Sequence, residues 1–171
     1  CAALDRQHPR DLFDIMLLLK NERITEEIKR GFLLGLLSSE RPIHELIAPN
    51  LQDQHQAFKN HFVGMSKEPF TYEDFQNVRN KLIALMQESL TERDKAFLLS
   101  FKETNPDWST FHNEAFPAVQ WKLKNIKKRK DRNPEKNRRQ DEQLKPALVT
   151  KQSASNLLRT QTTRLRPLLH Q

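Results

Sequence analysis

Glycine is scarce in this chain of 171 residues, which contains only Gly31, Gly35 and Gly64. The loops that cradle phosphates in P-loop and Rossmann proteins need several glycines within a few positions. Because no such loop can be written anywhere in the sequence, a self-sufficient nucleotide site of either kind is excluded.

Cysteine and long apolar runs are also scarce. Cys1 is the only cysteine, so neither an intramolecular disulfide nor a cysteine-ligated metal site can form. No strictly apolar run is longer than that of residues 15–19, far short of the ~20 residues that span a bilayer. We therefore expect a soluble, cytoplasmic protein with no membrane partner. Because residue 1 is not methionine and no signal-like start follows it, we also expect a fragment.

Histidine does not supply a recognisable metal motif. His44 and Glu45 match the first half of the zinc-protease HExxH pattern, but Ala48 stands where the second histidine should be. His55 and His61 are six positions apart and point to different faces of a helix. The sequence predicts no metal site within this chain alone.

Charge is distributed unevenly along the chain. The net charge is +7, yet residues 1–121 hold 14 Lys and Arg against 18 Asp and Glu. Residues 122–171 hold 15 Lys and Arg against four Asp and Glu. The basicity therefore belongs to the last third, where apolar periodicity fades and a solvated, partly disordered extension is the simplest interpretation.

Helical patterns dominate the rest. Leu12, Ile15, Met16 and Leu19 follow the spacing of an amphipathic helix whose first turn tolerates Pro9. Further helices are predicted from Thr25 to about residue 37, from Pro42 to residue 48, over residues 51–64, and after Thr71, Thr91 and Pro117. No convincing alternating strand is present. The sequence predicts a mainly α fold of six or seven short helices.

The stretch DRQHPRDLFDIMLLL, residues 5–19, concentrates charge where an apolar helix begins. Arg10 and Asp14 have the spacing of a surface ion pair worth ~0.2–0.5 kcal/mol. Asp11, in the first turn, complements the helix dipole at about 0.3–1 kcal/mol. An ordinary capped helix start therefore accounts for these residues.

A functional interpretation of the same stretch stands beside it. Asp11 and Asp14 project from one helical face, where a carboxylate can hold a hard cation or orient a hydroxyl, and Arg6 and Arg10 can meet phosphate oxygens. Magnesium-dependent nucleotidyl transfer needs several carboxylates around the metal and the substrate phosphates. If Asp11 is catalytic, it must reach the surface and its partners must lie outside this chain.

Four blocks of the sequence carry a resemblance. They are CAALDRQHPRDLFDIMLLL, HFVGMSKEPFTYEDFQNVRNKL, DKAFLLSFKETNPDW and FPAVQWKLKNI, covering roughly residues 1–130. In this order they resemble the AbiEii/AbiGii family of nucleotidyltransferase-like toxins, whose last conserved catalytic block is an Arg-Asp-x-x-Asp helix. Asp11 matches the late catalytic aspartate of that family, with Arg10 and Asp14 as supporting motif neighbours.

The resemblance implies a polymerase-β-like (α+β) nucleotidyltransferase in which a small catalytic core precedes a helical C-terminal domain. Such a toxin of a bacterial toxin–antitoxin or abortive-infection system would transfer a nucleotide from an NTP to an acceptor such as RNA, with Mg²⁺, and would have a cognate antitoxin. The family's Gly-Ser or Gly-Thr element and its Asp-x-Asp pair are absent here. We therefore expect the C-terminal part of such an enzyme, inactive and without a cofactor on its own.

These expectations divide the chain into three parts. Residues 1–20, with the RDLFD helix, would end the catalytic core, residues 21–130 would form the helical domain, and residues 131–171 a basic, flexible tail. The alternative function is a non-catalytic helical module that binds nucleic acid or an acidic protein through its basic end. The candidate phosphate or nucleic-acid contacts are Arg6, Lys122, Lys124, Lys127, Lys128, Arg129 and Lys130.

Overall fold

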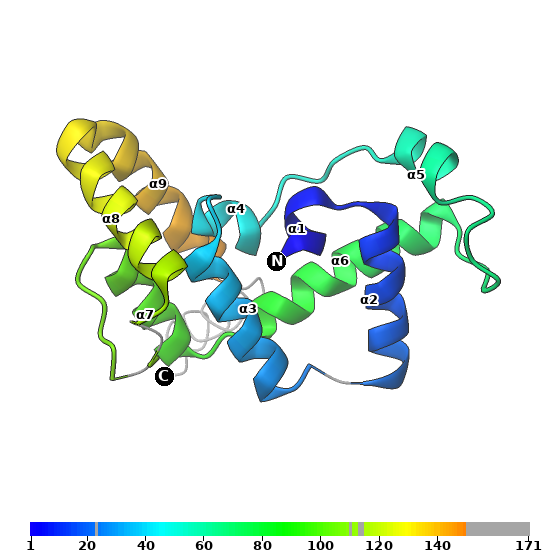
Figure 1. The fold of residues 1–171 in the computed structure, drawn as a ribbon, viewed down its shortest axis with the longest axis horizontal. Helices are drawn as coiled ribbons and strands as arrows, with labels where there is room; N and C mark the ends of the chain where they lie inside the picture. The colour runs from blue at the N-terminus through cyan, green and yellow to red at the C-terminus, as the bar shows by residue number, and fades with distance from the viewer. Residues whose placement is uncertain (23, 110, 113–114, 150–171) are drawn as a thin grey trace, which may run out of the picture.

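The computed structural model describes residues 1–22, 24–109, 111–112 and 115–149, and this part of the chain is helical with no strand (Figure 1). The mainly α prediction is confirmed, although nine helices are present in these residues where six or seven were predicted. The helices are α1 (Ala2–Arg6), α2 (Pro9–Asn21), α3 (Glu26–Ser38), α4 (Ile43–Ile47), α5 (His55–His61), α6 (Tyr72–Ser89), α7 (Glu92–Lys102), α8 (Pro117–Arg132) and α9 (Pro134–Ala147).

Short polar side chains set the starts of the longer helices. Thr71 accepts a hydrogen bond from the backbone N–H of Asp74, whose carboxylate accepts one from the Thr71 N–H, and Thr91 and Asp94 repeat this reciprocal cap at α7. Thr25 caps α3 with its hydroxyl. These three predicted caps are confirmed, and each is worth about 1 kcal/mol of helix stability.

The first charged stretch is broken into two helices by Gln7. Its φ of 49° is in the left-handed region, which ends α1 and turns the chain before α2 begins at Pro9. His8 then caps α2, because its Nδ1 accepts a hydrogen bond from the N–H of Arg10 at 3.3 Å. Asp11 consequently lies in the first turn of α2, as the sequence predicts.

One continuous apolar core joins the two ends of the molecule. Helix α2 packs along α6, α3 packs on α8, and α4 lies between α1 and α9 (Figure 1). Leu12, Leu36, Phe75 and Phe101 are fully buried. Within the described residues, no helix has both the length and the apolarity needed to cross a membrane.

Residues 51–54 differ from the prediction of a helix over residues 51–64. The helix α5 begins only at His55, and Leu51 is 57% exposed. The cause is a set of polar contacts with the turn after α1: the N–H of Gln52 donates to the side chain of Gln7, and Gln54 donates to the carbonyl of Arg6. These bonds hold the segment outside a helix. On α8, Trp121 is 50% exposed.

The predicted flexible tail from residue 131 contains a packed helix. Asn133 ends α8 and also caps α9, since its Oδ1 accepts a hydrogen bond from the N–H of Lys136 at 3.0 Å. Helix α9 turns back beside α8 and buries Leu144 and Leu148 against the core. The remainder of the predicted tail, residues 150–171, lies outside the described residues.

Candidate functional site

Asp11 reaches the surface of the helical array. Its side chain is 24% exposed, and Nη2 of Arg6 donates to both of its oxygens, at 3.2 Å and 3.0 Å. The guanidinium is itself 64% exposed, so the pair lies in water and the arginine can exchange its carboxylate partner for another anion. The requirement that Asp11 be accessible is met.

The two motif neighbours of Asp11 lie on the same helix with different contacts. Nε of Arg10 donates to the carbonyl of His61 at 3.2 Å and ties α2 to the end of α5. Asp14 is exposed one turn further along, and no ion pair involves it among the described residues. The structure therefore brings Arg6 and Asp11 into contact, while Arg10 faces α5.

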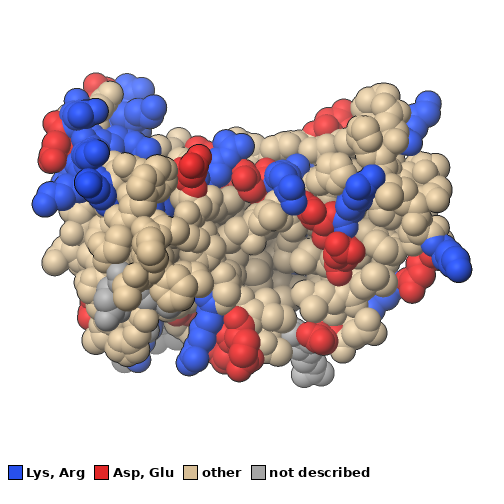
Figure 2. Space-filling model, viewed as in Figure 1, with Lys and Arg blue, Asp and Glu red and all other residues tan. Residues whose placement is uncertain are grey.

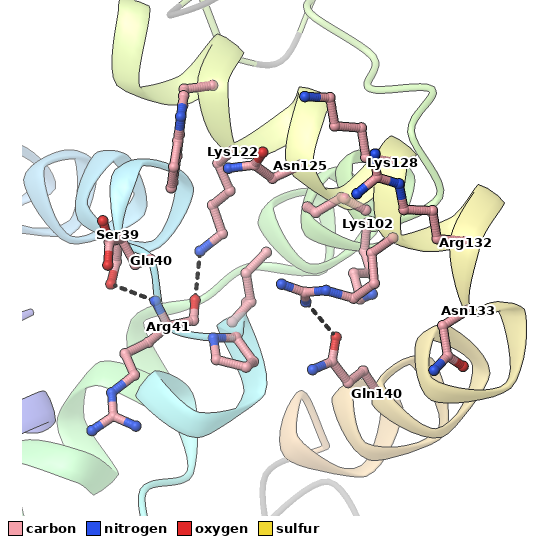
Figure 3. A pocket seen from close by; sticks show the side chains of 15 residues that line it. Ser39, Glu40, Arg41, Lys102, Lys122, Asn125, Lys128, Arg132, Asn133 and Gln140 are labelled. Carbon is pink, nitrogen blue, oxygen red and sulfur yellow. Dashed lines mark hydrogen bonds between the residues drawn. The ribbon is translucent and has the colours of Figure 1, made fainter.

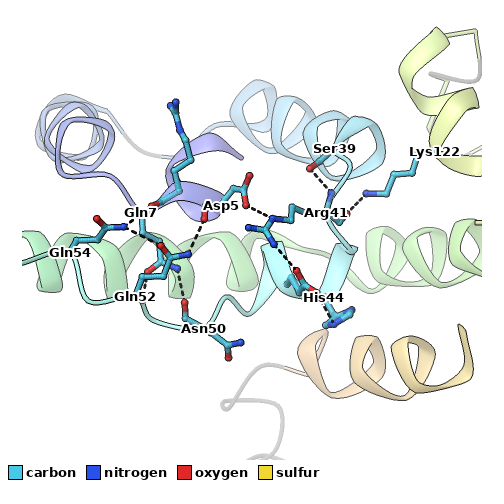
Figure 4. Close-up of polar contacts among 11 residues, drawn as sticks. Asp5, Gln7, Ser39, Arg41, His44, Asn50, Gln52, Gln54 and Lys122 are labelled. Carbon is cyan, nitrogen blue, oxygen red and sulfur yellow. Dashed lines mark hydrogen bonds and ion pairs between the residues drawn. The ribbon is translucent and has the colours of Figure 1, made fainter. Parts of the chain in front are cut away.

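The buried side-chain amide of Gln7 holds the turn between α1 and α2 in place. The side chain of Gln7 is 1% exposed; it donates to the carbonyl of Asn50 at 2.7 Å and accepts from the N–H of Gln52 at 3.0 Å (Figure 4). Nη1 of Arg79 donates to the same Gln7 oxygen at 3.3 Å and to the Gln52 carbonyl at 2.7 Å. Sequence analysis missed Gln7, because a glutamine within a charged stretch carries no signal of burial.

A second polar link joins α1 to the turn between α3 and α4. Asp5 accepts from Nε of Arg41 at 2.8 Å, and Glu45 lies 3.5 Å from the Arg41 Nη1 (Figure 4). Arg41 also donates its backbone N–H to Ser39, which shapes the turn between α3 and α4. The position of α1 is therefore fixed from both sides.

The carboxylates near Asp11 do not form a magnesium site. Among the described residues, no three side chains of the metal-binding types His, Cys, Asp or Glu gather at one point. A hard divalent cation takes six or more oxygen ligands, several of them carboxylates or substrate phosphates. The residues present do not fit Mg²⁺ by themselves, and Asp11 could contribute only one ligand.

The predicted basic contacts lie far from Asp11. Lys and Arg side chains gather over α8 and α9 at one end of the molecule, whereas α2 lies towards the other end (Figures 1 and 2). Lys124, Lys127 and Lys128 are exposed on α8, while Lys130 donates to the carbonyl of Glu103 at 3.3 Å. Arg129 donates to the amide oxygen of Gln140 at 3.0 Å. Arg6 is the one predicted phosphate contact that the structure places beside Asp11.

Lys122 is buried, whereas the sequence predicts it as a surface contact for phosphate or nucleic acid. It is 6% exposed, and its Nζ donates to the carbonyls of Leu36 and Arg41, each at 2.7 Å (Figure 3). Burial lowers the pKa of this ammonium to about 8, and the charges of Arg129 and Lys102 add to the effect. Lys122 joins α8 to the turn after α3 because the end of α3 and this turn offer carbonyls that need a donor.

Comparison with known families assigns this helical chain to a class. The family described as "Nucleotidyl transferase AbiEii toxin, Type IV TA system" matches residues 1–125. The chain belongs to this family of nucleotidyl transferase toxins, and the resemblance seen in the sequence is confirmed. Searches of curated proteins and of solved structures found no match.

Proposed function

We propose that this chain is the helical C-terminal part of a nucleotidyl transferase toxin that moves a nucleotide from an NTP to an RNA acceptor. Asp11 contributes one carboxylate to the active site, and the remaining groups, including those that hold Mg²⁺, come from residues outside these 171. A cognate antitoxin opposes the toxin in the cytoplasm. Membership of the family and the accessible carboxylate of Asp11 at the start of α2 support this function.

The surroundings of Asp11 suit a site that receives phosphates. The positive end of the α2 dipole favours negative charge at this position. Arg6 is exposed and presents a planar fork of donors, a geometry that matches phosphate oxygens as well as a carboxylate. When a triphosphate approaches, Arg6 can move from Asp11 to the phosphate and leave the carboxylate free.

The test compares nucleotide transfer by the complete protein with transfer by its Asp11→Asn variant, using labelled NTPs, magnesium and cellular RNA. The amide has the same shape without the charge, so transfer should fall by about 100-fold or more, which a positioned carboxylate can contribute. Glu22→Gln, at the other end of α2, is the matched control and should retain activity.

A structural role for Asp11 makes a different prediction. An exposed pair with Arg6 is worth only ~0–1 kcal/mol, so Asp11→Asn should leave the fold intact in either case. Unchanged transfer by Asp11→Asn would therefore reduce the residue to a partner of the helix dipole. Strong transfer by the 171-residue chain alone would refute the dependence on groups outside it.

The basic end of α8 favours a second candidate, a module that binds nucleic acid without catalysis. Lys124, Lys127 and Lys128 are exposed and form no ion pair among the described residues. Such a surface binds phosphate backbones with affinity that falls steeply as salt rises. RNA binding by the complete protein with no transfer of any of the four NTPs would favour this second function over the first.

A further inference from the structure

A pocket of about 460 Å³ opens between α8, the start of α9 and the turn that joins α3 to α4 (Figure 3). The volume is within the range of small-ligand pockets, about 300–1,000 Å³. One carboxylate, that of Glu40, faces six cationic side chains in its lining, which are Arg41, Lys102, Lys122, Lys128, Arg129 and Arg132. This excess of positive charge favours an anionic occupant.

Two of the six cations have carboxylate partners of their own. Arg41 is paired with Asp5 at 2.8 Å, and Lys102 lies 3.1 Å from Asp141. These residues hold the walls together and contribute little net charge to the pocket. The positive potential therefore comes from the four cations on α8.

Lys122 is the buried source of that potential. Its ammonium is held by two backbone carbonyls, and no carboxylate among the described residues forms an ion pair with it. The lowered pKa of Lys122 shows that burial and neighbouring cations disfavour its charge. An anion in the pocket would relieve this unfavourable field.

The other three cations line the open side of the pocket. Arg129 has a neutral partner, Gln140, and forms no ion pair in the described part of the chain. Lys128 and Arg132 are exposed and make no ion pair within the described ranges. Arginine forks and a nearby lysine form the arrangement that proteins use to bind phosphate.

An aromatic face completes the pocket. Trp121 lines it and is 50% exposed, and Asn125 follows one turn later with an amide that can donate and accept. Residues 121, 125, 129 and 132 share one face of α8, since they are spaced by three or four positions. An inorganic anion would use only the cations of the pocket. A nucleotide would use all of it, with its phosphate at the cations, its polar base edge at Asn125 and its flat base at Trp121.

We propose that this pocket binds one nucleotide unit of single-stranded RNA, with the base against Trp121 and the phosphate at Lys128, Arg129 and Arg132. Single-stranded RNA is specified because a base can stack on an aromatic side chain only when it is free of its neighbours. The inference rests on the proposed function in treating RNA as the acceptor, but binding is measured without any transfer.

The experiment titrates the protein into a fluorescein-labelled five-nucleotide oligouridylate at 50 and 150 mM NaCl and follows fluorescence anisotropy. Trp121→Ala should weaken binding about 10-fold, within the range that stacking confers, and Arg132→Ala should weaken it clearly as well. Lys136→Ala is the matched control, because it removes an exposed charge from the first turn of α9 outside the pocket, and should change affinity less than about twofold. Quenching of tryptophan emission by unlabelled oligouridylate should disappear in Trp121→Phe.

Several outcomes would overturn the inference. Equal losses from Lys136→Ala and Arg132→Ala, with no effect of Trp121→Ala, would show diffuse attraction to phosphates. Tighter binding of a polyglutamate peptide than of oligouridylate would indicate an acidic protein partner instead. If pocket variants lose RNA binding but the complete protein transfers no nucleotide, the pocket stands and the proposed function fails. If these variants bind RNA normally and the complete protein transfers nucleotides, the proposed function stands and the pocket is refuted.

Discussion

Replacing Lys122 by methionine tests whether the buried charge of this side chain destabilises the interface between α8 and the turn after α3. Methionine has a similar length and removes the charge and the donors. The pKa of Lys122 falls from 10.5 to about 8 in the folded chain, and one pKa unit corresponds to about 1.4 kcal/mol. The charged form therefore costs the folded state about 3 kcal/mol at neutral pH.

The direction with pH follows from proton binding. Between the folded pKa near 8 and the unfolded pKa near 10.5, the unfolded chain carries a proton on Lys122 that the folded chain has lost. Stability from this group therefore rises with pH across that window, is lowest below pH 8, and no longer changes above about 10.5. Of the about 3 kcal/mol, roughly 2 kcal/mol should be gained between pH 7 and pH 9.5.

The assay is urea unfolding of the original chain and of Lys122→Met at pH 7 and pH 9.5, in buffers without phosphate. Subtracting the variant removes the titration of every other group that both proteins share. The stability of the original chain relative to Lys122→Met should improve by about 2 kcal/mol at the higher pH. Lys124→Met, exposed on the same helix, should show no such change. A difference that stays constant with pH would refute the claim that this ammonium is buried with no counter-ion among the described residues.

Two further outcomes concern the fold. Leu144→Ala should cost about 2–5 kcal/mol in urea unfolding, because Leu144 is 1% exposed where α9 meets the core, and an effect below about 0.5 kcal/mol would mean that α9 does not pack there. Gln7→Ala should cost about 1–3 kcal/mol of unfolding free energy, since it leaves the Asn50 carbonyl and one Arg79 donor unpaired. Faster hydrogen exchange should be confined to residues 50–54. Exchange equal to that of the original chain would contradict this prediction.

Local signals accounted for most of the helix starts. Thr25, Thr71 and Thr91 are followed by residues that complete a cap, and Pro9 and Pro117 stand in first turns, so chemistry within four positions determines where α2, α3, α6, α7 and α8 begin. Sequence analysis missed α9 because its face is almost entirely charged and its buried residues are few. The dipeptide Asn133-Pro134 and the pair of Glu135 with Arg139 were the available signals.

Long-range contacts account for what local patterns did not predict. Whether a lysine is a surface cation or a buried donor depends on carbonyls more than 80 positions away, as at Lys122. The same holds for Gln7, whose partners come from residues 50, 52 and 79. The position of Asp11 was predictable because a helix start is local, whereas the pocket on α8 required three separated segments to meet.

Asn133 restricts how the helices α8 and α9 can move relative to each other. This single asparagine ends α8 and caps α9, so no linker separates the two helices. Neither helix can reorient without breaking a cap. Any change in the width of the pocket must then come from its opposite side, the turn at residues 39–41. Lys122 donates to the Arg41 carbonyl and so links this turn to α8. The neutral amine of Lys122 still has two N–H groups for the carbonyls of Leu36 and Arg41, so this turn stays attached to α8 when the proton is lost near pH 8.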